Sequence, residues 1–439
     1  MQEAQRPASA TRFVVGLSGL GGGLLALWLL APWRGANFPG FIRYAPIVPC
    51  AGVFAVIAIM ERLWPNVRGA SLPGAVLRPL DLARVAVKLW GLIVTLAMVA
   101  LAYWLLPEYR GTFYQPYWDF LLTLAPLLLL CPLYFAWMDR RIAEPGDDYY
   151  HLGRVALGRE RPDGARLTRH LLGFAVKGFF LPLMTVYLHD EIAALYRIYQ
   201  AAPAPIWNSF NFFYHLSYTV DLLFCVVGYT ISLRLFDSHI RSVEPTLAGW
   251  LAALICYQPF YSVIGRYYLQ YDDGTSWSQW LAPWPTIRSA WGGAINVLAI
   301  LYCLSTVAFG LRFSNLTHRG IITDGPYRFS KHPAYIAKNL SWWLIAVPFV
   351  GNQDAAASLR NCCLLGLLNL VYYARAKTEE RHLSQDANYV AYALWMNDHG
   401  LFRRIGINLR FLRYRAPVVS GDASLSAGRN GAAVPSRRN

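Results

Sequence analysis

Long apolar blocks are the feature that most restricts how this chain can fold. Mainly apolar blocks of about 17 to 25 residues recur along the 439-residue sequence, and this is the length that an α-helix needs to cross a bilayer core. In lipid the backbone polar groups must be satisfied within the segment, so such blocks form helices. With 56% hydrophobic and only 15% charged residues, the chain is not an ordinary water-soluble domain. The sequence predicts an all-α integral membrane protein.

The apolar blocks divide the chain into about ten predicted transmembrane helices. They lie at residues 13–31, 45–60, 85–106, 117–138, 170–188, 209–233, 247–263, 289–310, 335–350 and 358–374. The spans at 45–60 and 335–350 are short for a full crossing, and the second contains Pro348. A tilted, thin or partly re-entrant segment is the alternative at both places.

The basic residues predict how these helices are oriented. Of the 40 Lys and Arg residues, 30 lie in alternate gaps that include both termini, and only seven lie in the other gaps. By the positive-inside rule this places both termini in the cytoplasm. The net charge of +15 is then explained by topology and by attraction to anionic headgroups, so we expect membrane lipids as partners and no nucleic acid.

All seven cysteines lie in predicted spans without zinc-binding spacing, and we expect no metal.

Two polar clusters on the predicted cytoplasmic side carry the residues suited to chemistry. The first, between the eighth and ninth spans, contains Gly325, Pro326, Tyr327, Lys331, His332, Pro333 and Tyr335. Its turns and the following helix start offer backbone N–H groups to an anion. The second cluster, after the tenth span, contains the acidic pair Glu379 and Glu380, followed by Tyr389 and Tyr392. Only a helical hairpin separates the clusters, so we expect them to meet.

Such a set of groups suits a small zwitterionic ligand that carries a ring. S-adenosylmethionine fits, because its carboxylate needs donors, its amine and ribose need acceptors, and its sulfonium favours aromatic faces. The residue types alone do not separate it from NADPH, a lipid phosphate or a nucleotide.

The order of the two clusters resembles the isoprenylcysteine carboxyl methyltransferase family and its bacterial relatives. The resemblance rests on Gly-Pro-Tyr at 325–327, Lys-His-Pro-Ala-Tyr at 331–335, and Glu-Glu at 379–380 with Leu383 and the two tyrosines, and it covers about residues 315–395. Three departures stand out: Lys331 replaces an Arg and loses its bidentate fork, Ala337 replaces a Gly, and a Phe-Gly pair before the tyrosines is absent.

The resemblance implies an S-adenosylmethionine-dependent membrane methyltransferase whose hydrophobic acceptor enters from the bilayer, in a bacterial inner membrane. We therefore divide the chain into an N-terminal accessory region outside the resemblance (1–205, about five spans) and a C-terminal region with the methyltransferase-like core (206–415). The last residues (416–439) are rich in Ser, Gly, Ala, Pro and Arg and are predicted to form a disordered cytoplasmic tail. The implied cofactor-binding residues are Gly325, Pro326, Tyr327, Lys331, His332, Tyr335, Glu379 and Glu380. An amine, hydroxyl or phenol acceptor requires a general base, for which His332, Glu380 and Lys338 are the candidates.

Several other charged residues have alternative interpretations. We expect Arg319 and Arg328 to contact headgroups, with a role as cofactor ligands as the alternative, and Lys338 either to face the site or to extend toward headgroups. Lys88 and Lys177 should extend toward headgroups or form structural ion pairs. His215 and Asp221 lie deep in the sixth span, where ionisable groups face the bundle interior. They should bond to other helices or line an acceptor cavity.

The primary hypothesis is therefore a membrane methyltransferase acting on a lipid-like or isoprenoid-linked acceptor. Two rivals remain at this point. One is a sterol-reductase-like oxidoreductase that binds NADPH at a similar cytoplasmic site, and the other is a transporter or a non-catalytic scaffold. The few deep ionisable residues give no clear ion path, which argues against transport.

Overall fold

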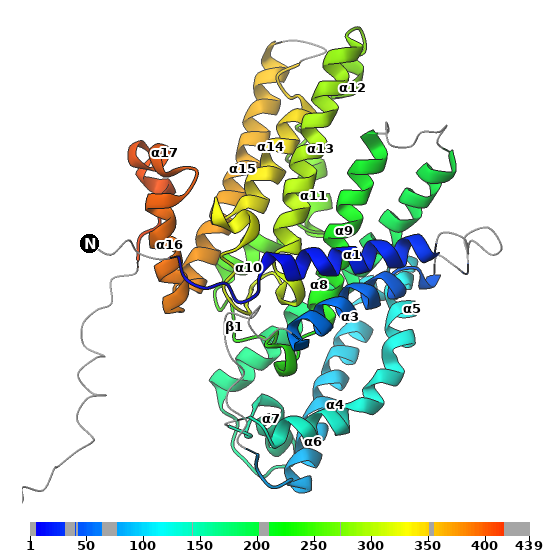
Figure 1. Cartoon of the computed structure of the whole chain (residues 1–439), viewed down its shortest axis with the longest axis vertical. Helices are drawn as coiled ribbons and strands as arrows, with labels where there is room; N and C mark the ends of the chain where they lie inside the picture. The colour runs from blue at the N-terminus through cyan, green and yellow to red at the C-terminus, as the bar shows by residue number, and fades with distance from the viewer. Residues whose placement is uncertain are drawn as a thin grey trace, which may run out of the picture.

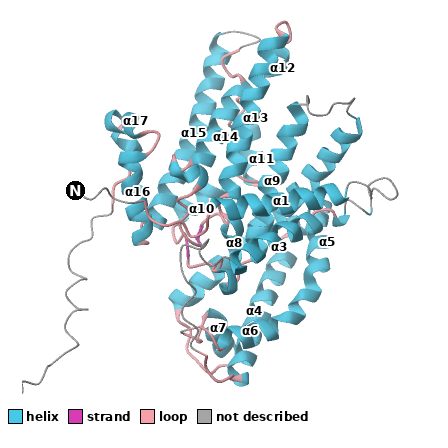
Figure 2. Ribbon diagram, in the orientation of Figure 1, coloured by secondary structure: helices cyan, strands magenta, loops and turns pink. Residues whose placement is uncertain are grey.

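The computed structural model describes residues 6–30, 40, 43–63, 77–142, 144–201, 210–272, 274–350 and 355–416. The predicted boundary between residues 205 and 206 lies outside these ranges, as does the predicted tail beyond Ala416. Within the described part, the chain is helical apart from loops and one short pair of strands (Figure 2).

The α-helices are α1 (Phe13–Leu30), α3 (Ile47–Leu63), α4 (Leu82–Leu105), α5 (Gln115–Leu124), α6 (Cys131–Asp139), α7 (Asp148–Ala156), α8 (Gly164–Ala201), α9 (Phe210–Thr230), α10 (Leu247–Leu254), α11 (Phe260–Tyr267), α12 (Trp277–Trp280), α13 (Pro285–Val307), α14 (Pro333–Ala346), α15 (Ala355–Leu383), α16 (Ala387–His399) and α17 (Arg403–Asn408). The 3-10 helices are η3 (Pro107–Arg110), η4 (Thr112–Tyr114), η5 (Ala125–Leu130), η7 (Arg234–Phe236), η8 (Gly310–Arg312), η9 (Gly325–Arg328) and η10 (Arg410–Leu412). The strands β1 (Ser242–Val243) and β2 (Thr317–His318) pair antiparallel, with Ser242 opposite His318.

Seven helical segments among the described residues are long and apolar enough to cross a membrane. They cover 13–30, 82–105, 112–139, 164–201, 210–230, 285–307 and 355–383, each overlapping a predicted span. Integral membrane character is thereby confirmed, while the number of ten transmembrane helices and their orientation stay predictions.

The other three predicted spans differ in form. The span at 45–60 is α3, with 17 residues, and the one at 335–350 is α14, with 14 residues. The span predicted at 247–263 is wrong as one helix, because α10 and α11 are separate.

The helices form a bundle crossed by an N-terminal pair (Figure 1). Helices α13, α14 and α15 run together, α9 packs between α13 and α8, and α4 packs on α6 and α7. Helices α1 and α3 lie across the middle of the molecule and pack closely on each other. A Cβ atom on Gly22 would lie 2.7 Å from the carbonyl oxygen of Gly52, so glycine at both positions permits this close approach.

Two groups of buried charged residues are held in ion pairs. The Lys88 ammonium lies 3.0 Å from Asp139 and 3.2 Å from Asp147. This confirms the structural ion pair, which was one of the two roles predicted for Lys88. Residues Glu61 of α3 and Arg312 of η8 form a second pair, with 2.7 Å between Oε1 and Nη1 and both side chains fully buried. This pair joins the N-terminal helices to the segment that leads into the first polar cluster.

Removing one member of the Glu61–Arg312 pair should destabilise the fold strongly. Glu61→Met leaves the Arg312 guanidinium buried without its carboxylate, and a broken buried pair costs about 3–5 kcal/mol. We expect a clearly lower midpoint of thermal unfolding in detergent. The double variant Glu61→Met with Arg312→Met removes both charges and should recover much of the loss. An unchanged midpoint for the single variant would show that the pair does not hold α3 against η8.

Candidate active site

The two predicted polar clusters meet at one end of the α14–α15 hairpin. Gly325 begins η9 with a φ of 61°, a left-handed conformation that favours glycine. Pro326 and Pro333 occupy the first turns of η9 and α14, where the missing N–H has no helical partner to lose. His332 therefore stands immediately before α14, facing the last turns of α15.

The Glu380 carboxylate joins the two clusters. Its Oε1 lies 2.5 Å from the Lys331 ammonium and 3.3 Å from Nε2 of His332. Its Oε2 accepts a hydrogen bond of 2.8 Å from Lys377, one turn earlier on α15. Burial lowers the pKa of the Lys331 ammonium, and the charge of Glu380 opposes this shift. Both carboxylate oxygens are engaged, and the residue is only 5% exposed. The main role of Glu380 is therefore to connect α15 to the start of α14.

Its neighbour Glu379 has a different environment. The Tyr335 hydroxyl donates a hydrogen bond of 2.9 Å to Oε2 of Glu379, and Nδ1 of His332 lies 4.0 Å from the same oxygen. The rings of His332 and Tyr335 stack, with centroids 5.5 Å apart and planes 4° from parallel. The Glu379 side chain is 40% exposed, so this carboxylate keeps capacity to accept hydrogen bonds from a ligand.

Arg375, one turn before Glu379 on α15, was not among the residues predicted for the site. Its guanidinium lies 5.3, 5.1 and 5.8 Å from the ring centroids of Tyr257, Tyr335 and Tyr372. It donates hydrogen bonds to Asn315 at 2.5 Å and to the Tyr257 hydroxyl at 3.3 Å. Among the described residues no carboxylate pairs with this buried cation. Its spacing of four residues from Glu379, which puts both on one face of α15, was the available sequence signal.

Two cavities that adjoin this cluster are lined by both His332 and Tyr335. The larger, of about 370 Å³, lies between α14, α15 and the α16–α17 segment, and Lys331, His332 and Glu380 are among its lining residues. The smaller, of about 70 Å³, is lined by aromatic residues together with Lys338, Arg375 and Glu379. The larger volume lies in the range of small-molecule sites.

Seven of the nine residues predicted for the site line these two cavities. The large cavity is lined by Lys331, His332, Tyr335 and Glu380, and the small one also by Tyr327, Lys338 and Glu379. Gly325 and Pro326 line neither; a Cβ atom on Gly325 would lie 2.7 Å from the Phe13 ring of α1. Their role as cofactor contacts stays a prediction.

The second pair of predicted tyrosines also lies here. The Tyr392 hydroxyl donates a hydrogen bond of 2.7 Å to the carbonyl oxygen of Tyr327, which ties α16 to η9. Burial raises the pKa of Tyr389 well above its ordinary value. Both phenols therefore remain protonated at neutral pH.

A second sequence-based expectation, besides the single helix at 247–263, is wrong. Arg319 does not contact headgroups: it is 2% exposed and donates hydrogen bonds to the carbonyl oxygens of Ser238, Gly228, Phe313 and Ile231 at 2.6–2.8 Å. Three of these carbonyls lie near the end of α9 or in the loop after it, where helical partners are missing, and the fourth belongs to Phe313, directly after η8. Arg328, by contrast, is exposed.

The deep ionisable residues bond to other helices, as one of the two alternatives predicted. Asp221 of α9 accepts hydrogen bonds from Tyr302, at 3.0 Å, and from Thr306 of α13. His215 lies 2.7 Å from Glu191 of α8. Lys338 points into the interior rather than toward headgroups, and its ammonium lies 5.3–5.9 Å from the ring centroids of Tyr302, Trp342 and Tyr372.

No group of His, Cys, Asp or Glu within the described ranges is arranged to hold a metal ion.

Comparison with known proteins finds one match. Residues 295–385 match the model of the isoprenylcysteine carboxyl methyltransferase family, and these residues run from α13 to just beyond α15. The chain matches no curated protein and no solved structure. The matched segment contains His332, Tyr335 and the Glu379–Glu380 pair, so the predicted resemblance is confirmed over the part of the chain that carries the candidate site. That part is similar to a methyltransferase family.

Proposed function

We propose that this protein is an S-adenosylmethionine-dependent integral-membrane methyltransferase that acts on a lipid-like acceptor at the cytoplasmic membrane face. The observation that carries the proposal is the meeting of His332 and Tyr335 with Glu379 and Glu380 beside a cavity of about 370 Å³, within the segment that matches a methyltransferase family. The cytoplasmic position rests on the distribution of Lys and Arg residues, 30 of them in the gaps on this side.

The residues around Tyr335 fit the chemistry of the proposed cofactor. Arg375 is a buried cation with no carboxylate partner in the described part of the chain, which suits the carboxylate of S-adenosylmethionine. Glu379 has free acceptor capacity for an ammonium or ribose hydroxyl, and the aromatic rings favour a sulfonium. The cofactor would supply an activated methyl group, and the aromatic wall would exclude water.

The acceptor needs an apolar surface in the same cavity as the polar residues Lys331, His332 and Glu380. Ile336 and Tyr372 line that cavity from the α14–α15 hairpin, and Met396, Phe402 and Leu412 line its other side. A hydrophobic tail among these side chains would leave its polar end beside His332. In-line methyl transfer depends mainly on holding the reacting atoms in position, so this orientation is the main task of the site.

An amine or hydroxyl acceptor would also need a group that takes its proton. Glu380 is poorly suited to this, because its oxygens are engaged by Lys331, His332 and Lys377. His332 is better placed: when neutral with its proton on Nε2, it donates to Glu380 and leaves Nδ1 as an acceptor. Lys338 remains the second candidate. A carboxylate acceptor would require no base.

Ligand binding distinguishes the proposed methyltransferase from the rival oxidoreductase. We expect calorimetry on the full chain in detergent to show binding of S-adenosylmethionine and none of NADPH, whereas binding of NADPH alone would replace the proposal with a reductase. The match to a methyltransferase family favours the first outcome.

Substitution of the two adjacent acids should give different results. Glu379→Gln leaves the ion pairs of Glu380 intact, so it should weaken S-adenosylmethionine binding by about tenfold, the effect of one lost charged hydrogen bond, without changing the midpoint of thermal unfolding. Glu380→Gln should lower both the affinity and the midpoint, because Lys331 and Lys377 lose their carboxylate.

The matched control for these variants is Glu108→Gln, an exposed acid in η3 outside the matched segment. It should change neither quantity. Unchanged affinity in Glu379→Gln would remove Glu379 from the proposed cofactor site.

Filling the large cavity should block the acceptor and spare the cofactor. Ile336 lines the cavity, whereas Leu340, one turn later on α14, is 51% exposed. We expect Ile336→Trp to reduce transfer of labelled methyl groups into an extracted membrane-lipid pool by about tenfold, since one misplaced group can cost that much or more. Leu340→Trp should retain activity. Equal activity of both variants, with equal cofactor affinity, would place the acceptor elsewhere.

A further inference from the structure

A separate cavity of about 230 Å³ lies outside the segment that matches the methyltransferase family. It is enclosed by α6, the start of α7, α8 and the loop that follows α9. Apolar side chains, among them Leu92, Phe135, Met138 and Phe174, form much of its wall. Charged and polar side chains form the rest, and several of them have no partner.

Four donors face this cavity without an anion to bind. Lys177 of α8 makes no ion pair or hydrogen bond with a described residue; its ammonium lies 5.8 Å from the Phe174 ring centroid. The Ser232 hydroxyl and Nδ1 of His239 are buried without a hydrogen-bond partner, and Asp237 lies 3.6 Å from that nitrogen. The Arg234 side chain is exposed at the edge and forms no ion pair within the described ranges.

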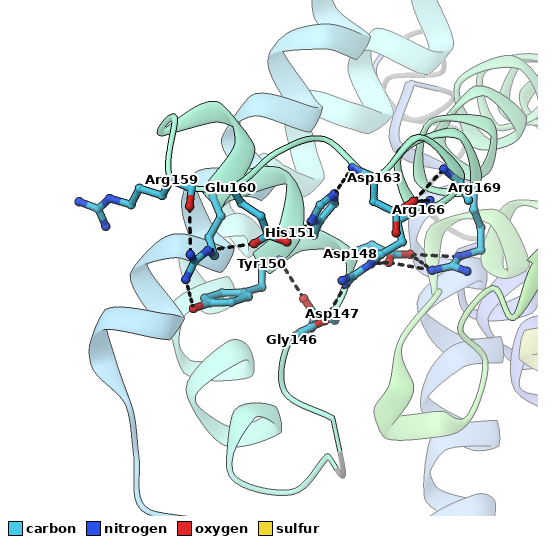
Figure 3. Close-up of polar contacts among 12 residues, drawn as sticks. Gly146, Asp147, Asp148, Tyr150, His151, Arg159, Glu160, Asp163, Arg166 and Arg169 are labelled. Atoms are coloured by element: carbon cyan, nitrogen blue, oxygen red, sulfur yellow. Dashed lines mark hydrogen bonds and ion pairs between the residues drawn. The ribbon is translucent and has the colours of Figure 1, made fainter.

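The two carboxylates that line the cavity are engaged with other groups, as Figure 3 shows for Asp148. Asp148 lies 3.3 Å from Arg166 and 2.9 Å from Arg169. Asp147 accepts a hydrogen bond of 3.1 Å from the backbone N–H of Tyr150 and lies 3.2 Å from Lys88. Neither neutralises Lys177.

The remaining titratable groups do not neutralise it either. Burial, helped by the charge of Arg234, lowers the pKa of His239 to about 4 against the opposing charge of Asp237, so the ring is neutral at pH 7 and carries one N–H donor. Nε2 of His170 lies 2.9 Å from the Thr95 hydroxyl and is already satisfied. The cavity therefore has more hydrogen-bond donors than free acceptors.

We propose that this cavity binds the phosphate group of an anionic phospholipid, with Lys177, Arg234, Ser232 and His239 as its donors. A phosphate has several acceptor oxygens and binds Lys and Arg through charge-assisted hydrogen bonds. A metal cation is disfavoured, because both carboxylates that line the cavity are already engaged by Lys88, Arg166 and Arg169. The apolar wall provides a surface for the glycerol and first acyl carbons, which favours a lipid over free phosphate.

The proposed site does not depend on the proposed methyltransferase activity. The loop that carries Ser232 and His239 continues into β1, where Ser242 lies 2.9 Å from His382 of α15. A bound lipid would therefore hold the loop that supports the end of α15 near the candidate active site.

The test is calorimetry on the full chain in detergent with dioctanoyl phosphatidic acid, dioctanoylglycerol and inorganic phosphate. We expect phosphatidic acid to bind and dioctanoylglycerol not to bind. Lys177→Met should weaken phosphatidic acid binding by about tenfold or more, as for a lost charged hydrogen bond, and Lys177→Arg should bind as the natural protein does. Arg404→Gln, an exposed arginine in α17, is the control and should change nothing.

A folding check accompanies the binding measurement. Lys177→Met removes a charge without a carboxylate partner, so its unfolding midpoint without lipid should be equal or higher. Arg234→Gln alters an exposed side chain and provides a second variant, with an expected loss of severalfold in affinity. Unchanged affinity in both variants would overturn the site. Equal binding of inorganic phosphate, lost in Lys177→Met, would overturn the lipid as the source of the phosphate.

Discussion

The buried Arg319 guanidinium fixes the segment on which the candidate active site depends. A charged group in a buried position is stable only when its donors are satisfied, and the four carbonyl oxygens around Arg319 come from α9, from the loop after it and from Phe313. One side chain thus fastens the loop before η9 to the end of a long helix. The turns at Gly325 and Pro333 then place Lys331 and His332 at the start of α14.

The adjacent acids Glu379 and Glu380 make different contacts, because the side chains of neighbouring residues on a helix point about 100° apart. Glu380 turns toward Lys331 and His332 and closes the hairpin. Glu379 turns toward Tyr335 and keeps exposed oxygens. The same geometry brings Arg375 next to Glu379, one turn away, so a cation and an available carboxylate stand side by side. A zwitterionic ligand requires such a pair.

The sequence predicted the membrane class and both motifs, since apolar block length and residue order are local properties. It did not predict Arg375 as a site residue, because its role depends on rings from the turn between α10 and α11, from α14 and from α15, which meet only in the folded chain. The same reason accounts for Arg319: a charge count assigns an arginine in a cytoplasmic loop to headgroups, and only the fold shows four carbonyl oxygens around it. The break between α10 and α11 was missed because an apolar run does not show whether a helix is continuous.

The N-terminal helices contact the loop that leads into the site. Asp324, next to Gly325, accepts a hydrogen bond of 3.0 Å from the backbone N–H of Phe13, where α1 begins. Thr323 donates its hydroxyl to the carbonyl oxygen of Pro7 at 2.8 Å, and Glu61 of α3 holds Arg312. The loop before the site is therefore fixed on one side by α9 and on the other by α1 and α3. A change in the packing of α1 on α3 would be transmitted to His332 through these contacts, so these helices belong to the scaffold that sets the geometry of the site.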